Sequence, residues 1–184
     1  MQLEKTIKQY DHALQKCREL FRNKTKDYGT SWRVLRASSL TDQLFIKAQR
    51  IRTIEENRVQ KVSESVESEF IALVNYALIG LIQLKIKNTE SLELSEAEAL
   101  TLFDKEASSI KELMLNKNHD YGEAWRDMRI SSFTDLILQK LLRIRSIEDN
   151  KGVTIASEGI DAGYSDIVNY AIFALIKLEE QNKK

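Results

Sequence analysis

The fold is decided by a stretch that occurs twice: residues 19–57 read ELFRNKTKDYGTSWRVLRASSLTDQLFIKAQRIRTIEEN, and residues 112–150 read ELMLNKNHDYGEAWRDMRISSFTDLILQKLLRIRSIEDN. The two segments are identical at 21 of 39 positions. After a one-residue insertion the match resumes, with Val74–Ala77 over Val168–Ala171. We infer that the chain is a tandem duplication.

The spacing between the copies indicates their size. A period near 93 residues exceeds the 20–50-residue units of solenoid proteins, so each copy is expected to be a domain-sized unit. We assign residues 1–87 to the first helical repeat, 88–94 to a polar linker and 95–184 to the second repeat. The two copies are expected to pack against each other as a pseudo-dimer.

Composition and periodicity predict an all-α fold. Proline is absent and only six residues are glycine, which disfavours sheets and long loops. Apolar residues such as Ile7, Tyr10, Leu14 and Cys17 recur at helical spacing, and glycine in each Asp-Tyr-Gly is expected to end a helix. Three main helices are predicted in each copy. In the first copy the outer two span 3–23 and 64–87, and the middle one begins at 39 or 41. In the second copy the outer two span 95–116 and 157–181, the middle one begins at 132 or 134, and the first of the three starts with a capping box at Ser95.

Charge and cysteine content exclude several classes. The 28 basic and 28 acidic residues balance, which argues against direct nucleic-acid binding. A single cysteine, Cys17, cannot form an internal disulfide, nor can it build a structural zinc site with two histidines. The charged N-terminus lacks a signal peptide's apolar run, and residues 70–84 are too short and too polar at their flanks to span a bilayer. We therefore expect a cytoplasmic protein.

The most informative polar segment lies near the start of the last predicted helix. At helical spacing, Glu158, Asp161, Ser165, Asp166 and Asn169 share one face. Three carboxylates and an amide are ligands that suit Mg²⁺, which would bridge to substrate phosphates. Glu158, Asp161 and Asp166 are thus the candidate metal-binding and catalytic residues. The alternative is an ordinary solvated helix face.

The first copy keeps part of this acidic pattern, at Glu64, Glu67 and Asn75. Ala72, however, stands where the second copy has Asp166. The first copy therefore has the weaker acidic face, and we expect the second copy to carry the more competent site.

A basic pattern follows on the middle helix of each copy. Lys140 and Arg143, like Lys47 and Arg50, are spaced i,i+3 and could hold a phosphate chain. The alternative is that these cations pair with the carboxylates of the third helix, so that the two neutralise each other.

The Asp-Tyr-Gly-x-x-Trp motif supplies the aromatic candidates. Its aromatic rings could stack on a nucleobase or could belong to the core, and its aspartates could cap helices. The motif residues and their neighbours on the third helix that we consider for substrate binding are Asp120, Tyr121, Trp125, Asn169 and Tyr170, with Asp27, Tyr28 and Trp32 in the first copy.

These motifs resemble a known family. Lys-x-x-Asp-Tyr-Gly (24–29 and 117–122), Lys140-x-x-Arg143 and the segment from Glu158 to Ala171 are similar to the nucleotide modification associated domain 1 family, in two tandem copies. That resemblance implies a nucleotide-related role. More distantly, Glu158-x-x-Asp161 resembles the all-α nucleoside triphosphate pyrophosphohydrolases of the MazG and dimeric dUTPase type. Those enzymes bind magnesium with carboxylates from two helices, so the resemblance implies a second acidic helix. The nearby candidates for it are Glu148 with Asp149, or Asp135.

We therefore expect a nucleotide-binding helical protein, with Mg²⁺-dependent nucleoside triphosphate pyrophosphohydrolysis as the finer hypothesis. In it Glu158, Asp161 and Asp166 hold the metal, Lys140 and Arg143 contact phosphate, Asn169 orients water or ligand, and Tyr121 or Trp125 lines the base pocket. The rival hypothesis is a non-catalytic module that binds a protein partner or small ligand. A homo-oligomer also stays open, because apolar stripes can pack between molecules.

Overall fold

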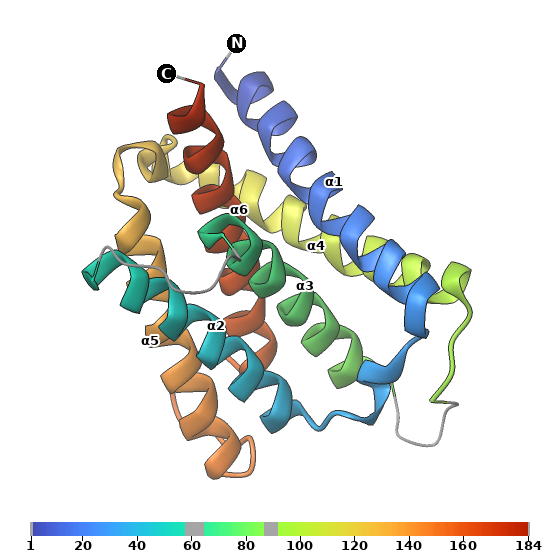
Figure 1. Cartoon of the computed structure of the whole chain (residues 1–184). Helices are drawn as coiled ribbons and strands as arrows, with labels where there is room; N and C mark the ends of the chain where they lie inside the picture. The colour runs from blue at the N-terminus through green and yellow to red at the C-terminus, as the bar shows by residue number, and fades with distance from the viewer. Residues whose placement is uncertain (1, 58–64, 87–91, 184) are drawn as a thin grey trace.

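Six long helices make up most of the part of the chain that the computed structural model describes, residues 2–57, 65–86 and 92–183 (Figure 1). They are α1 (Gln2–Tyr28), α2 (Ala37–Asn57), α3 (Val66–Lys85), α4 (Glu96–Tyr121), α5 (Ile130–Asp149) and α6 (Ile160–Asn182). Short 3-10 helices, η1 (Ser31–Val34) and η2 (Ala124–Asp127), follow α1 and α4. The prediction of an all-α fold built from two homologous units of three main helices is confirmed.

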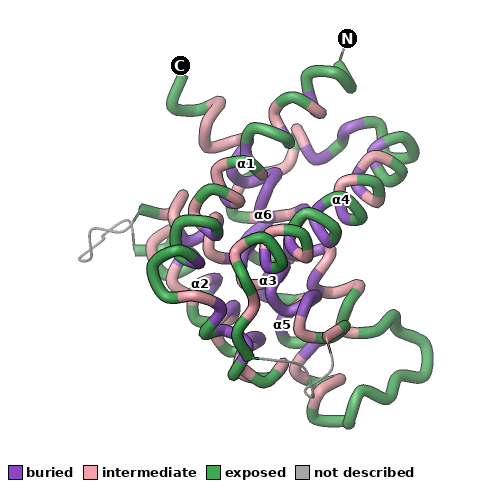
Figure 2. The backbone as a smooth tube through the Cα atoms, turned by 90° about the vertical axis from the view of Figure 1, so that its right-hand side faces the viewer, coloured by how far each residue is buried: buried purple, intermediate pink, exposed green. Residues whose placement is uncertain are grey.

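The helices form three layers, each holding one helix from each copy. Helices α3 and α6 lie in the middle, with α1 and α4 on one side and α2 and α5 on the other (Figure 1). Each helix contacts its counterpart in the other copy, α1 with α4, α2 with α5 and α3 with α6. The two copies therefore share one core, and its buried residues line the inward faces of all three layers (Figure 2).

The middle layer is the most apolar part of the core. Along α3 and α6 the buried residues form nearly continuous runs, Leu73–Ile82 and Ile167–Ile176, apart from single half-buried positions. Gly80 allows α6 to approach α3 closely, because a Cβ there would lie 3.0 Å from the ring of Tyr164. Tyr164 is fully buried, and its hydroxyl forms a 2.8 Å hydrogen bond with Thr41 Oγ1 of α2.

By length and hydropathy, α3 is the one helix among the described residues that could cross a membrane. Of that apolar window, 56% is buried inside the protein, as is usual for the central helix of a core. The helix therefore gives no positive evidence for a membrane span.

Polar bonds between α2 and α5 repeat the internal symmetry. Thr41 Oγ1 donates to Glu148 at 2.7 Å, and its counterpart Thr134 Oγ1 donates to Glu55 at 2.9 Å. Two further ion pairs follow the same symmetry, Arg145 with Asp42 at 3.1 Å and Arg52 with Asp135 at 3.6 Å. The residues that form these bonds are identical in the two copies, because each copy contributes the same residues to the contact between them.

The helix ends differ from the prediction at several points. Helices α2 and α5 begin at Ala37 and Ile130, before the predicted starts at 39 or 41 and at 132 or 134. Helices α1 and α4 run five residues beyond the predicted ends at 23 and 116, and stop where Gly29 and Gly122 adopt φ values of 69° and 59°. The glycine stops and the Ser95 capping box are confirmed. Helix α6, in contrast, begins at Ile160 rather than 157, with Gly159 as its N-cap, so Glu158 lies before the helix.

Replacing Gly80 by leucine should destabilise the protein by about 1–3 kcal/mol, because the added side chain must displace the ring of Tyr164. Urea unfolding followed by circular dichroism measures the change. A double-mutant cycle with Tyr164→Leu is the control, and the two effects should be less than additive because the smaller side chain makes room. A Gly80→Leu protein as stable as the parent would contradict this packing.

Candidate functional site

Asp166 is the centre of the charged network on the second copy. It is 8% exposed and lies on α6, where Lys117 of α4 donates to Oδ1 at 2.8 Å and Lys140 of α5 lies 2.7 Å from Oδ2. One buried carboxylate thus joins the three helices of this copy. The alternative that third-helix carboxylates neutralise second-helix cations is confirmed for Lys140.

The two lysines keep Asp166 ionised. Burial opposes the charge, but the hydrogen bonds from Lys117 and Lys140 outweigh it and hold the pKa of the Asp166 carboxyl below its usual value. Partial burial also opposes the charge on Lys117, yet its hydrogen bond to Asp166 raises the Lys117 pKa. Asp166 is therefore a fixed anion at neutral pH, with its oxygens already engaged.

A pocket of about 310 Å³ lies on one side of Asp166. It brings together most of the predicted substrate-binding residues of the second copy, including Tyr121, Trp125, Asn169 and Tyr170. Trp125 is 7% exposed, stacks on Phe173 with ring centroids 4.3 Å apart, and donates from Nε1 to Asn118 at 3.2 Å. Trp125 is thus part of the core, while Tyr121 is the ring that stands open to solvent.

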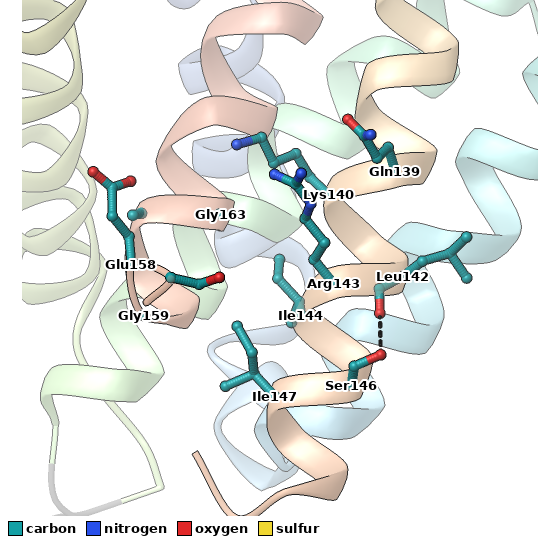
Figure 3. Close-up of a pocket in the computed structure, with 12 residues that line it drawn as sticks. Gln139, Lys140, Leu142, Arg143, Ile144, Ser146, Ile147, Glu158, Gly159 and Gly163 are labelled. Atoms are coloured by element: carbon teal, nitrogen blue, oxygen red, sulfur yellow. Dashed lines mark hydrogen bonds between the residues drawn. The ribbon is translucent and has the colours of Figure 1, made fainter. Parts of the chain in front are cut away.

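A second pocket, of about 540 Å³, lies between α5 and the start of α6 (Figure 3). Lys140 and Arg143 line the α5 side of this pocket, and Glu158 and Gly159 line the side formed by the start of α6 (Figure 3). Within the part of the chain that the structure describes, the Arg143 side chain forms no ion pair or hydrogen bond. Lys140 lies between the two pockets, because it lines this one and also contacts Asp166, which lines the other.

The first copy explains why Arg143 is unpaired. There Glu69, which is 5% exposed, binds both Arg50, the counterpart of Arg143, and Lys47, the counterpart of Lys140. Gly163 stands at the Glu69 position in the second copy, where a Cβ would lie 2.8 Å from Ile144. The carboxylate that pairs with the lysine of the middle helix is Glu69 in the first copy and Asp166, one helical turn further along, in the second. This corrects the inference that the first copy simply has a weaker acidic face.

The three predicted metal ligands are not gathered. Asp166 is buried with its two lysines, Asp161 is exposed on the first turn of α6, and Glu158 lies before that helix. Among residues 2–57, 65–86 and 92–183, no three His, Cys, Asp or Glu side chains lie close enough to share an ion. The face that was predicted from helical spacing fails at Glu158 because the helix begins after Gly159.

The other acidic candidates are also engaged elsewhere or exposed. Glu148 binds Thr41 and Asp135 pairs with Arg52, so both serve the contact between copies. Asp120 is exposed beside His119, and Asp27 is exposed.

In the first copy, Glu67 lies 3.4 Å from Lys16 and Asn75 donates to the Cys17 carbonyl at 3.0 Å. Trp32 is buried and Tyr28 is exposed, as are their counterparts in the second copy. Glu64 lies outside the described residues.

Sequence reasoning missed Lys117, Glu69 and Gly163 as determinants of the site. The signal was present in the repeat itself. Aligning the copies places Glu69 over Gly163 three positions before Ala72 over Asp166, and such a spacing is one helical turn. Reading the two differences together would have predicted a displaced carboxylate.

The chain matches the model of a known protein family. The family model for nucleotide modification associated domain 1 matches residues 24–84 and again 117–178. The chain belongs to this family. The two segments coincide with the two copies, and each spans one set of the lysine, aromatic and acidic motifs described above. No match was found among proteins of curated function or among solved structures.

Replacing Asp166 by asparagine should destabilise the protein by about 1–3 kcal/mol at neutral pH, because the buried carboxylate that pairs with the half-buried Lys140 and the exposed Lys117 loses its charge. The folded-state pKa of Asp166 lies below its unfolded value, so its contribution is present above the unfolded pKa of about 4 and is lost as the pH falls further. Urea midpoints of parent and Asp166→Asn should therefore converge below pH 4.

Asp161→Asn is the matched control, since Asp161 is exposed on the same helix. Its effect should stay within about 0.5 kcal/mol, the size of a helix-dipole contribution. A constant gap between parent and Asp166→Asn from pH 7 to 3 would contradict the ionic role.

Proposed function

We propose that this family member binds a nucleoside phosphate on its second copy, with the phosphates held at Arg143 in the pocket between α5 and α6. The observation that carries the proposal is the unpaired Arg143, in a pocket of about 540 Å³ that also contains Lys140 and Glu158. Sites for small molecules usually measure 300–1,000 Å³ and contain a few convergent polar groups.

The chemistry of this pocket favours an anion. The Arg143 guanidinium can donate two parallel hydrogen bonds to a phosphate. Gly159, the N-cap of α6, has no side chain to cap the first N–H groups of this helix, although a carboxylate oxygen of Asp161 lies beside it. Those groups carry partial positive charge and suit the same anion. The phosphate would replace the carboxylate that Glu69 supplies in the first copy.

The neighbouring pocket offers a place for the nucleoside. Tyr121 is 72% exposed and Tyr170 half-buried, and both line the 310 Å³ pocket on the far side of the Lys140–Asp166 pair. Exposed aromatic rings stack on bases without selecting their sequence. Family membership supports a nucleotide as the ligand that links both regions.

Magnesium-dependent pyrophosphohydrolysis remains the finer hypothesis, and the donor set does not favour it. Two lysines occupy the Asp166 oxygens, and Glu158 and Asp161 lie apart from it. Binding without hydrolysis is therefore the function that we propose. Release of phosphate or pyrophosphate from nucleoside triphosphates, dependent on Mg²⁺ and lost in Asp161→Asn, would instead support the enzyme.

Replacing Arg143 by glutamine should weaken the binding of nucleoside triphosphates ten-fold or more, because a charge-assisted hydrogen bond contributes about 1.5–3 kcal/mol. Isothermal titration calorimetry with a panel of canonical and modified nucleoside triphosphates measures this. Stability should not change, because the Arg143 side chain has no partner among the described residues.

Lys105→Gln is the control, since it removes the same charge from an exposed position on α4 and Lys105 forms no ion pair with any described residue. Its affinity should match the parent within a factor of two or so. Binding that survives Arg143→Gln, or silence across the whole panel, would favour the rival hypothesis of a module that binds a protein partner.

A further inference from the structure

Arg33, in η1 of the first copy, is a buried cation without an acid partner. The residue is only 5% exposed, and Nη1 of its guanidinium donates to the side-chain oxygen of Gln83. That amide is neutral, and its nitrogen donates to the backbone carbonyls of Trp32, Arg33 and Leu35. No Asp or Glu of the described residues forms an ion pair with Arg33. A buried charge that lacks a counter-ion is strongly destabilising.

The second copy shows what the first one lacks. Arg126 is the counterpart of Arg33, and its Nε donates to Glu123 at 2.6 Å. Its Nη1 lies 3.5 Å from Glu180, and its Nη2 donates to two side chains of α1. Every nitrogen of this guanidinium therefore has a partner within the protein, and two of the partners are carboxylates.

In the first copy the arginine is kept, but both carboxylates are replaced. Thr30 stands at the position of Glu123, and Ile86 stands at that of Glu180. The Thr30 hydroxyl is engaged by the backbone of segment 92–94, so it does not serve the guanidinium. The two α1 side chains that bind Arg126 have apolar counterparts on α4. The loss of every counter-ion around a retained arginine indicates that the anion comes from outside the chain.

A pocket of about 420 Å³ lies beside this guanidinium. Arg33 Nε is enclosed and has no partner, whereas Nη2, which also has none among the described residues, is not enclosed and is the atom that can meet a ligand in the pocket. Arg36 lines the same pocket, is exposed, and forms no side-chain bond with any residue that the structure describes. None of the described residues that line it is acidic.

The start of α2 forms another wall of this pocket. Ala37, the first residue of the helix, lines it, and the Arg36 carbonyl accepts the Leu40 N–H at 3.1 Å. The N–H groups of the first turn have no carbonyl partner within a helix and carry partial positive charge, so they suit an anion. Two guanidinium groups and a helix N-terminus thus converge on one space.

We infer that this pocket binds the phosphate group of a small organic phosphate ester, at a site distinct from that of Arg143. A phosphate monoester carries nearly two negative charges at neutral pH, which match the two guanidinium groups of Arg33 and Arg36. Val34 and Leu92, which are 71% and 57% exposed, line the pocket and offer an apolar surface to the organic group. The ester takes the place that Glu123 and Glu180 fill in the second copy.

Isothermal titration calorimetry with n-butyl phosphate tests this site. The Arg143→Gln variant is used as the parent protein, so that the second-copy pocket does not contribute to the heat. Inorganic phosphate and n-butanol are the comparison ligands, because each keeps one half of the ester. We expect saturable binding of n-butyl phosphate, several-fold weaker binding of inorganic phosphate and none of n-butanol.

Two variants at exposed positions locate the binding without disturbing the core. Arg36→Gln should weaken the binding of n-butyl phosphate about ten-fold, and Arg129→Gln, the same change at the equivalent position before α5, should leave it unchanged. Val34→Asp should abolish binding, because the new carboxylate competes for the two guanidinium groups. The second copy carries Asp127 at that position, so the fold should tolerate the change, and circular dichroism checks it.

The absence of heat with n-butyl phosphate would overturn the site. So would binding that persists in Val34→Asp, binding that Arg129→Gln weakens as much as Arg36→Gln does, or equally tight binding of inorganic phosphate. This test is separate from that of the proposed function. Failure here would leave the binding of nucleoside triphosphates at Arg143 intact, and failure there would not alter the titration with n-butyl phosphate.

Discussion

The ring of Tyr164 rests against the backbone of Gly80 where α6 packs on α3, and the rest of the structure depends on the contact between these two helices. Both are too apolar to face water, and each copy alone would leave one of them half uncovered. Burying them against each other places α1 with α4 and α2 with α5 in the outer layers. The hydrogen bond between the Tyr164 hydroxyl of α6 and Thr41 of α2 then joins the middle layer to an outer one, and Thr41 in turn donates to Glu148 of α5 within that outer layer.

Sharing a core left the polar surroundings of each copy free to differ. A carboxylate must neutralise the lysine of the middle helix in both copies, but it comes from Glu69 in one and from Asp166 in the other. That difference of one helical turn opens a different space in each copy. Beside α6 it leaves Arg143 without an anion, and beside α3 it leaves Lys24 without one. The two copies therefore carry pockets with different charged residues, although their sequences are related.

Part of the site could be predicted from the sequence and part could not. Tyr121, Asn169 and Tyr170, which the sequence analysis groups as substrate-binding candidates, line one pocket because α4 packs against α6. The joint carboxylate face of Glu158, Asp161 and Asp166 was wrong, because it assumed that one helix begins before Gly159. A shift of two or three residues in a helix start rotates a side chain away from its expected neighbours.

The sequence by itself determined the helices, the duplication and the family, because apolar periodicity, the absence of proline and a repeated set of motifs are local properties of the chain. Only the tertiary structure decided which charges meet. Asp166 shares no local pattern with Lys117, which lies 49 positions away, and their pairing depends on how α4 packs against α6. Asp166 finds buried partners and becomes part of the framework, whereas Arg143 and Lys24 find no anion among the described residues.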